Sequence, residues 1–245
     1  SGGARGLAHI GAIEELERRG YCITSIAGCS MGALIGAMYA AGKLAEVKEW
    51  MVQLDKKKIL SLVDFSFSLN HLVKGEKVMD ALKEIVPDVN IEDLPIPYAA
   101  VATDWNSGKE VVFKKGSLYE AVRSSISIPL FFNPVRKGEM LLVDGGLVNG
   151  LPLNRVARVK GDLLVGVNVS THDYKEEKLM SDIIDKKTLA KSLPAAIVKR
   201  IMDYQEGLGL NYMTLLSRTI SIMLEQNTRQ QIIISKPDIA VQVQM

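Results

Sequence analysis

The sequence has little cysteine and little histidine, and both scarcities exclude whole classes of protein. Its 245 residues include only Cys22 and Cys29, and three histidines, His9, His71 and His172. Two cysteines are too few for a disulfide framework, and they lack a metal-like spacing with histidine. The sequence therefore predicts a protein of a reducing compartment and shows no pattern of a metal site.

An excess of one charge and a long apolar run are also missing. The 30 Lys and Arg residues nearly balance 28 Asp and Glu residues, and no basic block is long enough to follow a phosphate backbone, so nucleic acid is not an expected partner. No apolar run reaches the roughly 20 residues that span a bilayer, and the first residues do not form a signal peptide. We expect a cytoplasmic protein that contacts membranes at most peripherally. The pattern favours no particular oligomeric state.

Apolar residues are abundant, at 47% of the chain, which is enough to bury one full core. We expect a single domain over residues 1–245. The chain opens on glycines without a preceding strand and ends in a strand-like run at 239–243, so the domain is expected to be truncated at both ends. Residues 56–76 combine a lysine triplet with alternating phenylalanines, which favours a cap or an interfacial insertion; a packed insertion is the alternative.

Hydrophobic periodicity alternates along the chain between the helical and the strand pattern. Strands buried on both faces and separated by helices indicate a three-layer α/β/α domain with a mainly parallel central sheet. The expected helices cover residues 7–19, 33–41 and 187–228, and the expected strands cover 21–27, 98–103, 110–113, 140–143 and 163–167.

A candidate nucleophile stands in the run Gly28-Cys29-Ser30-Met31-Gly32, which fits G-x-S-x-G. Glycines two residues on either side of the serine permit a tight turn that exposes its hydroxyl. The pattern alone is equally compatible with an ordinary turn serine. A β-favouring run before it and a buried helix after it favour the nucleophile, because the serine then lies at a helix N-terminus.

The glycine-rich run at residues 1–6 offers backbone N–H groups that lead into a helix, as an oxyanion hole requires. A phosphate-binding loop is the alternative, because glycines before a helix bind anions in general. The run lacks the Gly-Lys-Ser/Thr ending of a P-loop and the spacing of dinucleotide sites.

Two residues compete as the base for Ser30. His172 follows the strand at 163–169 and would complete the order Ser, Asp, His of α/β-hydrolases. Asp144 ends an apolar strand, and the glycines at 145 and 146 let its carboxylate approach another turn. An isolated Asp-Gly-Gly is most often a plain turn, so both possibilities stay open on the residues alone.

Taken in order, these motifs resemble the patatin-like phospholipase family, in its bacterial form. Residues 1–11 are similar to its oxyanion loop and first helix, residues 28–32 to its nucleophile elbow, and residues 144–146 to its base motif. Residues 125–134 are similar to the segment that bacterial members carry before the aspartate strand. The chain departs from the family in having two glycines at its start where three are usual.

The resemblance implies a Ser30–Asp144 dyad without a histidine. The N–H groups of Gly2, Gly3, Ala4 and Arg5 would then stabilise the oxyanion, and the acyl group would pass through a covalent acyl-enzyme on Ser30. The implied substrates are glycerophospholipids, lysophospholipids or simpler acyl esters, with no metal and no cofactor. Two alternatives remain: an esterase with a Ser30-Asp144-His172 triad, and a lipid-binding protein without catalytic activity.

Overall fold

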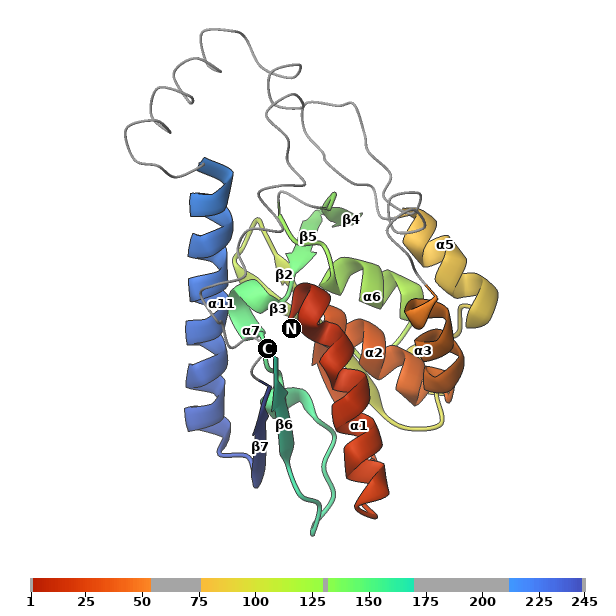
Figure 1. Ribbon diagram of the computed structural model, residues 1–245. Coiled ribbons are helices and arrows are strands. Elements are labelled where there is room, and N and C mark those ends of the chain that lie inside the picture. Colours follow the sequence, from red (N-terminus) through yellow and green to blue (C-terminus); the bar gives the residue numbers. More distant parts are fainter. Residues whose placement is uncertain (1, 54–75, 130–131, 170–211, 244–245) are drawn as a thin grey trace, which may run out of the picture.

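A computed structural model describes residues 2–53, 76–129, 132–169 and 212–243 (Figure 1). The predicted insertion at 56–76 lies outside the described residues except for its last position, and so do His71 and His172. The assignment of residues 1–245 to a single domain stays a prediction.

The predicted elements appear in the expected order with shifted ends, and further helices and one further strand that the sequence analysis did not predict lie between them among the described residues. The predicted helix at 187–228 is described only from residue 212 onward. The helices are η1 (Gly3–Leu7), α1 (Ala8–Arg18), α2 (Met31–Ala40), α3 (Leu44–Val52), α5 (Glu76–Ile85), η2 (Ile91–Asp93), α6 (Leu118–Ser125), α7 (Gly146–Asn149), η3 (Leu153–Arg155) and α11 (Tyr212–Ser235). The strands are β1 (Ile26–Cys29), β2 (Tyr98–Asp104), β3 (Lys109–Phe113), β4 (Val135–Lys137), β5 (Met140–Asp144), β6 (Val165–Asn168) and β7 (Ile239–Gln242).

The central strand of the main sheet is β2, and all seven of its residues are buried. It pairs in parallel with β1 and antiparallel with β3 and β5, while β4 pairs antiparallel with β5. Because β3 pairs with residues 100–104 of β2, which overlap the residues paired with β1 and those paired with β5, it occupies one edge of that strand. The strands β1 and β5 therefore share the opposite edge, one after the other.

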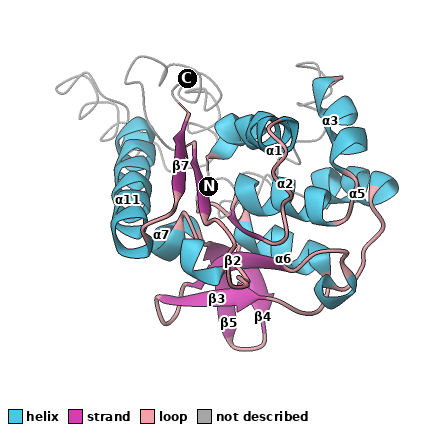
Figure 2. Cartoon of the chain, turned by 90° about the horizontal axis from the view of Figure 1, so that it is seen from below, coloured by secondary structure: helices cyan, strands magenta, loops and turns pink. Residues whose placement is uncertain are grey.

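Helices cover both faces of this sheet, which confirms the predicted three-layer α/β/α class. The helices α2 and α6 pack against β2 on one face, with α3 and α5 next to them, while α7 contacts β2 and β3 and is itself covered by α11. In both ribbon views α11 lies beside β7, which pairs with β6 in a separate two-stranded parallel sheet (Figures 1 and 2).

The main sheet is mixed, where a mainly parallel one was expected. The reason lies in two hairpins, β2–β3 and β4–β5, which turn at Gly108 and Gly138 with φ values of 67° and 59°. Positive φ is the usual requirement of tight hairpin turns, and glycine meets it without strain. The strand pattern located β2, β3 and β5 but not β4, and it did not reveal that adjacent strands turn back on each other.

Small side chains let α2 approach the sheet closely. Ala33, Ala37 and Ala40 are almost fully buried, and a Cβ at Gly36 would lie 2.7 Å from Cγ2 of Ile26 on β1. Most of the residues of α2 are buried. This agrees with its sequence, which is apolar on all sides, as is typical of a buried helix.

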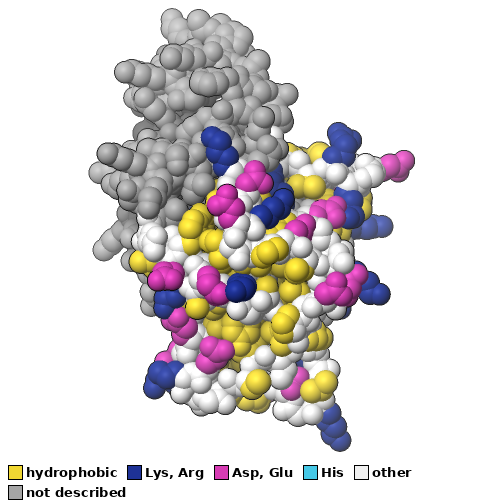
Figure 3. All heavy atoms as spheres, turned by 90° about the vertical axis from the view of Figure 1, so that its right-hand side faces the viewer, with side chains coloured by type: hydrophobic (Ala, Val, Ile, Leu, Met, Phe, Trp, Pro, Cys, Tyr) yellow, Lys and Arg dark blue, Asp and Glu magenta, His cyan; other side chains and the backbone are white. Residues whose placement is uncertain are grey.

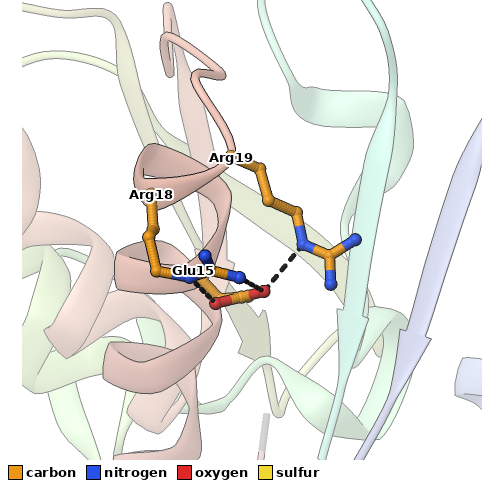
Figure 4. A network of polar contacts seen from close by, with 3 residues as sticks. All are labelled: Glu15, Arg18 and Arg19. Atoms are coloured by element: carbon orange, nitrogen blue, oxygen red, sulfur yellow. Dashed lines mark hydrogen bonds and ion pairs between the residues drawn. The ribbon is translucent and has the colours of Figure 1, made fainter.

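The surface carries both charges in mixture. On the face drawn in Figure 3, Lys and Arg alternate with Asp and Glu around a central group of apolar side chains. On α1, Glu15 accepts hydrogen bonds from Arg18 and Arg19, and all three side chains are exposed (Figure 4). Among the described helices, none combines the length and the apolar character needed to cross a bilayer.

Candidate active site

Ser30 occupies a sharp turn between the last residue of β1 and the first residue of α2. Its φ of 56° and ψ of −129° are unusual for a residue with a side chain and are typical of strained functional positions. A Cβ at Gly28 would lie 2.3 Å from the carbonyl oxygen of Gly32, so the turn closes only with glycine there. The first glycine of G-x-S-x-G thus has a steric cause in this chain.

The sheet brings Asp144 to this turn. Cys29, at the end of β1, pairs with Val101, and Asp144, at the end of β5, pairs with the next residue of β2, Ala102. Since β1 runs parallel and β5 antiparallel to β2 on the same edge, the carboxyl ends of the two strands meet tip to tip. The structure therefore places Ser30 beside Asp144, although more than a hundred residues separate them in the sequence.

Gly145 allows this close meeting of strands. A Cβ at this position would lie 2.2 Å from the carbonyl oxygen of Val101. The Asp144 backbone is fixed on both sides, because its N–H donates to the carbonyl oxygen of Ser127 at 2.9 Å and its own carbonyl accepts from Thr103 Oγ1 at 3.0 Å.

The two carboxylate oxygens of Asp144 have different surroundings. Oδ1 accepts the N–H of Gly146 at 2.8 Å and lies 3.7 Å from the Sγ of Cys29. Oδ2 is buried, and no described residue forms a hydrogen bond with it that meets strict geometry. The Ser30 side chain is nevertheless close enough to lower the Asp144 pKa by hydrogen bonding.

Burial controls the ionisation of this site. It raises the pKa of Asp144 above the ordinary value of an aspartate, although Ser30 and the Gly146 N–H act in the opposite direction. A raised pKa makes a carboxylate a stronger proton acceptor once it is ionised. Burial and the nearby Asp144 also raise the pKa of the Cys29 thiol well above its usual range, so this thiol is protonated and is not a competing nucleophile.

The glycine-rich loop packs directly on the elbow. A Cβ at Gly6 would overlap the Met31 side chain, at 1.9 Å from its Cγ, and one at Gly2 would lie 2.2 Å from Cγ2 of Val169. The loop forms the short helix η1, in which the N–H of Arg5 donates to the carbonyl oxygen of Gly2 at 3.1 Å. The Arg5 N–H is therefore already engaged, whereas N–H groups at the very start of a helix lack partners within it.

Ser125 is a site neighbour to which the sequence analysis gave no role. Its hydroxyl accepts the backbone N–H of Ser30 at 2.9 Å and donates to the carbonyl oxygen of Val101 at 2.6 Å. The segment 125–134, which is similar to a segment of the bacterial family members, includes Ser125, but no residue pattern predicted its contact with Ser30. His9 is buried on α1, and no three acidic, histidine or cysteine side chains of the described part of the chain gather as metal ligands would.

A family model described as patatin-like phospholipase matches residues 1–157, which is well over half of the chain. The chain belongs to the patatin-like phospholipase family. The match covers η1, the elbow and the Asp144 strand, so the resemblance drawn from the ordered motifs is confirmed. The roles of single residues are not part of that match.

Relatives of this patatin-like chain include longer proteins. An uncharacterised NTE family protein of Mycobacterium tuberculosis is 48% identical over 170 residues, which cover 69% of this chain and 47% of the relative. Neuropathy target esterase sws of Drosophila melanogaster is 31% identical over 179 residues, which cover 70% of this chain and 12% of the relative. The chain thus spans about half the length of the mycobacterial relative and a small part of the fly protein.

Among solved structures, VipD from Legionella pneumophila aligns with a TM-score of 0.44 and 17% sequence identity. The alignment covers 78% of this chain and 52% of that protein.

Proposed function

We propose that this chain is a serine acyl hydrolase of lipid carboxyl esters, with Ser30 as the nucleophile and Asp144 as its base. One observation carries the proposal: β1 and β5 end tip to tip, with a strained serine at one end and, at the other, an aspartate whose Oδ2 is buried and lacks a well-formed hydrogen bond. An unpartnered carboxylate oxygen beside a hydroxyl is ready to accept its proton. Membership of a phospholipase family supports the substrate class.

In the proposed reaction the Ser30 hydroxyl attacks the ester carbonyl carbon while Asp144 takes up its proton. The carbonyl oxygen becomes an oxyanion, and backbone N–H groups of the loop Gly2–Arg5 stabilise it. Because the Arg5 N–H already donates to Gly2, we assign the main share to the N–H groups that precede it. The bond to the leaving alcohol then breaks, and the alcohol takes the proton from Asp144.

The second half of the cycle releases the acyl group. Water gives a proton to Asp144 and attacks the acyl-enzyme carbonyl, and the collapse of this second tetrahedral intermediate returns the proton to Ser30 with loss of the free acid. The cycle needs neither a metal nor a cofactor. We propose phospholipids, lysophospholipids or simpler acyl esters as substrates, and peripheral contact with the cytoplasmic side of a membrane.

Labelling with a fluorophosphonate probe tests the nucleophile. We expect the wild type to be labelled and Ser30→Ala to remain unlabelled. Ser124→Ala should be labelled as the wild type is, because the buried Ser124 hydroxyl donates within α6 to the carbonyl oxygen of Glu120. A wild type that binds liposomes but is never labelled would favour a lipid-binding protein instead.

Ester hydrolysis tests the substrate and the base. Against p-nitrophenyl esters of rising chain length, we expect a preference for medium or long acyl chains, and highest turnover on acetate would contradict this. The dyad predicts that His172→Ala keeps near-full activity. Loss of several orders of magnitude in that variant would instead support the triad.

A further inference from the structure

The Ser125 hydroxyl lies where β1 and β2 separate. It is fully buried, and it bridges two backbone groups, accepting from the N–H of Ser30 and donating to the carbonyl oxygen of Val101. The β1–β2 ladder ends at the pair of Cys29 and Val101, so the hydroxyl continues the connection one residue beyond the last paired residue. It ties the strained nucleophile turn to the central strand.

The same segment also holds the other half of the site. Two residues further along, the carbonyl oxygen of Ser127 accepts the N–H of Asp144 at 2.9 Å. The Ser127 hydroxyl is fixed in turn, because it donates to the carbonyl oxygen of Arg123 at 2.7 Å and accepts from the Arg123 side chain at 2.6 Å. The last residue of α6 and the turn that follows it therefore contact the backbone of both Ser30 and Asp144.

We infer that Ser125 is a positioning residue for catalysis: its hydroxyl sets the backbone of Ser30 at the distance from Asp144 that proton transfer requires. The inference rests on the proposed function of Ser30 and Asp144. Ser125 does not contact the substrate or the reacting atoms; it acts through the N–H of the nucleophile.

The physical reason is strain. A non-glycine residue at positive φ persists only where its surroundings hold it, and the Ser30 N–H has Ser125 as its partner. Without the Ser125 hydroxyl, this N–H and the Val101 carbonyl both lose a buried partner, and the turn relaxes to recover hydrogen bonds. A shift of about 1 Å at a nucleophile can reduce the rate of the chemical step about 100-fold without a change in substrate affinity.

The chain offers a matched control in the adjacent residue. Ser124 is also fully buried near the end of α6, but its hydroxyl donates to the carbonyl oxygen of Glu120 within the helix. Ser125→Ala and Ser124→Ala thus remove the same group from neighbouring buried positions. We expect kcat for a p-nitrophenyl ester to fall about 10- to 100-fold in Ser125→Ala with KM within about threefold of the wild type, while Ser124→Ala stays near the wild type in both.

The fluorophosphonate labelling rate gives a second readout that a purely structural role would not move. It should fall in Ser125→Ala by a factor similar to kcat, because the probe also needs an aligned nucleophile. Ser125→Cys keeps a donor and an acceptor, so it should fold even if the alanine variant does not; because a thiol forms weaker and longer hydrogen bonds than a hydroxyl, it should recover only part of both rates. Equal rates in folded Ser125→Ala and Ser124→Ala, or wild-type rates in a Ser125→Cys variant whose alanine counterpart is unfolded, would overturn the inference.

These outcomes separate the inference from the function on which it rests. A wild type that is neither labelled nor active refutes the proposed function. A wild type that is labelled through Ser30, together with a Ser125→Ala variant that is labelled equally fast, leaves the function intact and refutes the role of Ser125.

Discussion

Two polar networks of this protein, each of three residues, differ in exposure, in charge and in the quality of their hydrogen bonds. On α1, Glu15 accepts hydrogen bonds of 2.7, 2.8 and 2.7 Å from Arg18 and Arg19, with both charges present and every side chain exposed. At the junction of β1 and β5, Ser30, Ser125 and Asp144 are 3% exposed or less, and their contacts include one carboxylate oxygen without a well-formed hydrogen bond.

The comparison shows that burial determines how much a polar contact contributes to stability. Water and salt screen the α1 cluster, so its short distances contribute little to stability. At the buried junction each lost partner leaves a polar group without water, which costs about 1–3 kcal/mol. We therefore expect substitutions in the buried network to have larger effects than substitutions in the exposed one, although the buried network has fewer charges and poorer hydrogen-bond geometry.

The largest effect is expected at Asp144. Asp144→Asn keeps the shape and the contact with the Gly146 N–H, but it removes the proton acceptor, so kcat/KM for an ester should fall about 10³-fold. Asp104→Asn is the matched control, because Asp104 is also little exposed and belongs to the same sheet but faces the β2–β3 turn. Comparable activity losses in the two variants would mean that the junction has no special role.

The next effect is steric and concerns stability. Gly28→Ala places a Cβ 2.3 Å from a backbone oxygen, so the free energy of unfolding should decrease by about 3 kcal/mol in urea denaturation. Gly11→Ala is the control on α1, where a Cβ meets nothing within 4 Å and alanine favours the helix. That variant should be as stable as the wild type or more so. Equal losses in both would contradict the tight packing inferred for the elbow.

The pH dependence follows from the direction of the Asp144 pKa shift. Because burial raises this pKa, the acid limb of kcat/KM should lie above the ordinary aspartate value of 3.8, with about a tenfold loss per pH unit below it. Stability has the opposite pH dependence to activity. The unfolded chain loses the Asp144 proton near pH 3.8, at a lower pH than the folded chain does. The free energy of unfolding therefore decreases as pH rises above 3.8 toward the raised pKa of the folded state. Asp144→Asn should remove that decrease, and an acid limb at or below 3.8 would contradict the burial effect.

The smallest effect is expected at the exposed cluster. Hydrogen bonds from Arg18 and Arg19 lower the pKa of Glu15 to about 2, so its contribution to stability is present above its ordinary pKa of 4.5 and is lost as pH falls through about 2. Screening keeps that contribution small. At physiological salt, Glu15→Gln should have a Tm inseparable from that of the wild type. A clear decrease that persists in high salt would reverse the comparison between the two networks.

Local signals predicted α1, α2, part of α11 and most of the strands, but not α3, α5, α6 or α7. Runs of β-favouring apolar residues located β2, β3, β5 and β7, and the G-x-S-x-G pattern includes the glycine at 28 that the turn requires. The predicted strand at 21–27 was displaced, because only 26–29 pair with β2. The run 21–25 has β-favouring residues, but no strand within the described residues pairs with it, and strand formation depends on pairing rather than on propensity alone.

The sequence by itself determined which chemical groups are available: a serine between spaced glycines, an aspartate at the end of an apolar strand, and few histidines. Only the tertiary structure decided that these groups meet, because the direction of β5 relative to β1 depends on hairpin turns and on which edge of β2 each strand occupies. The contact from Ser125 was likewise invisible in the sequence. A hydrogen bond between distant residues leaves no periodic pattern, since it depends on the packing of α6 against the sheet.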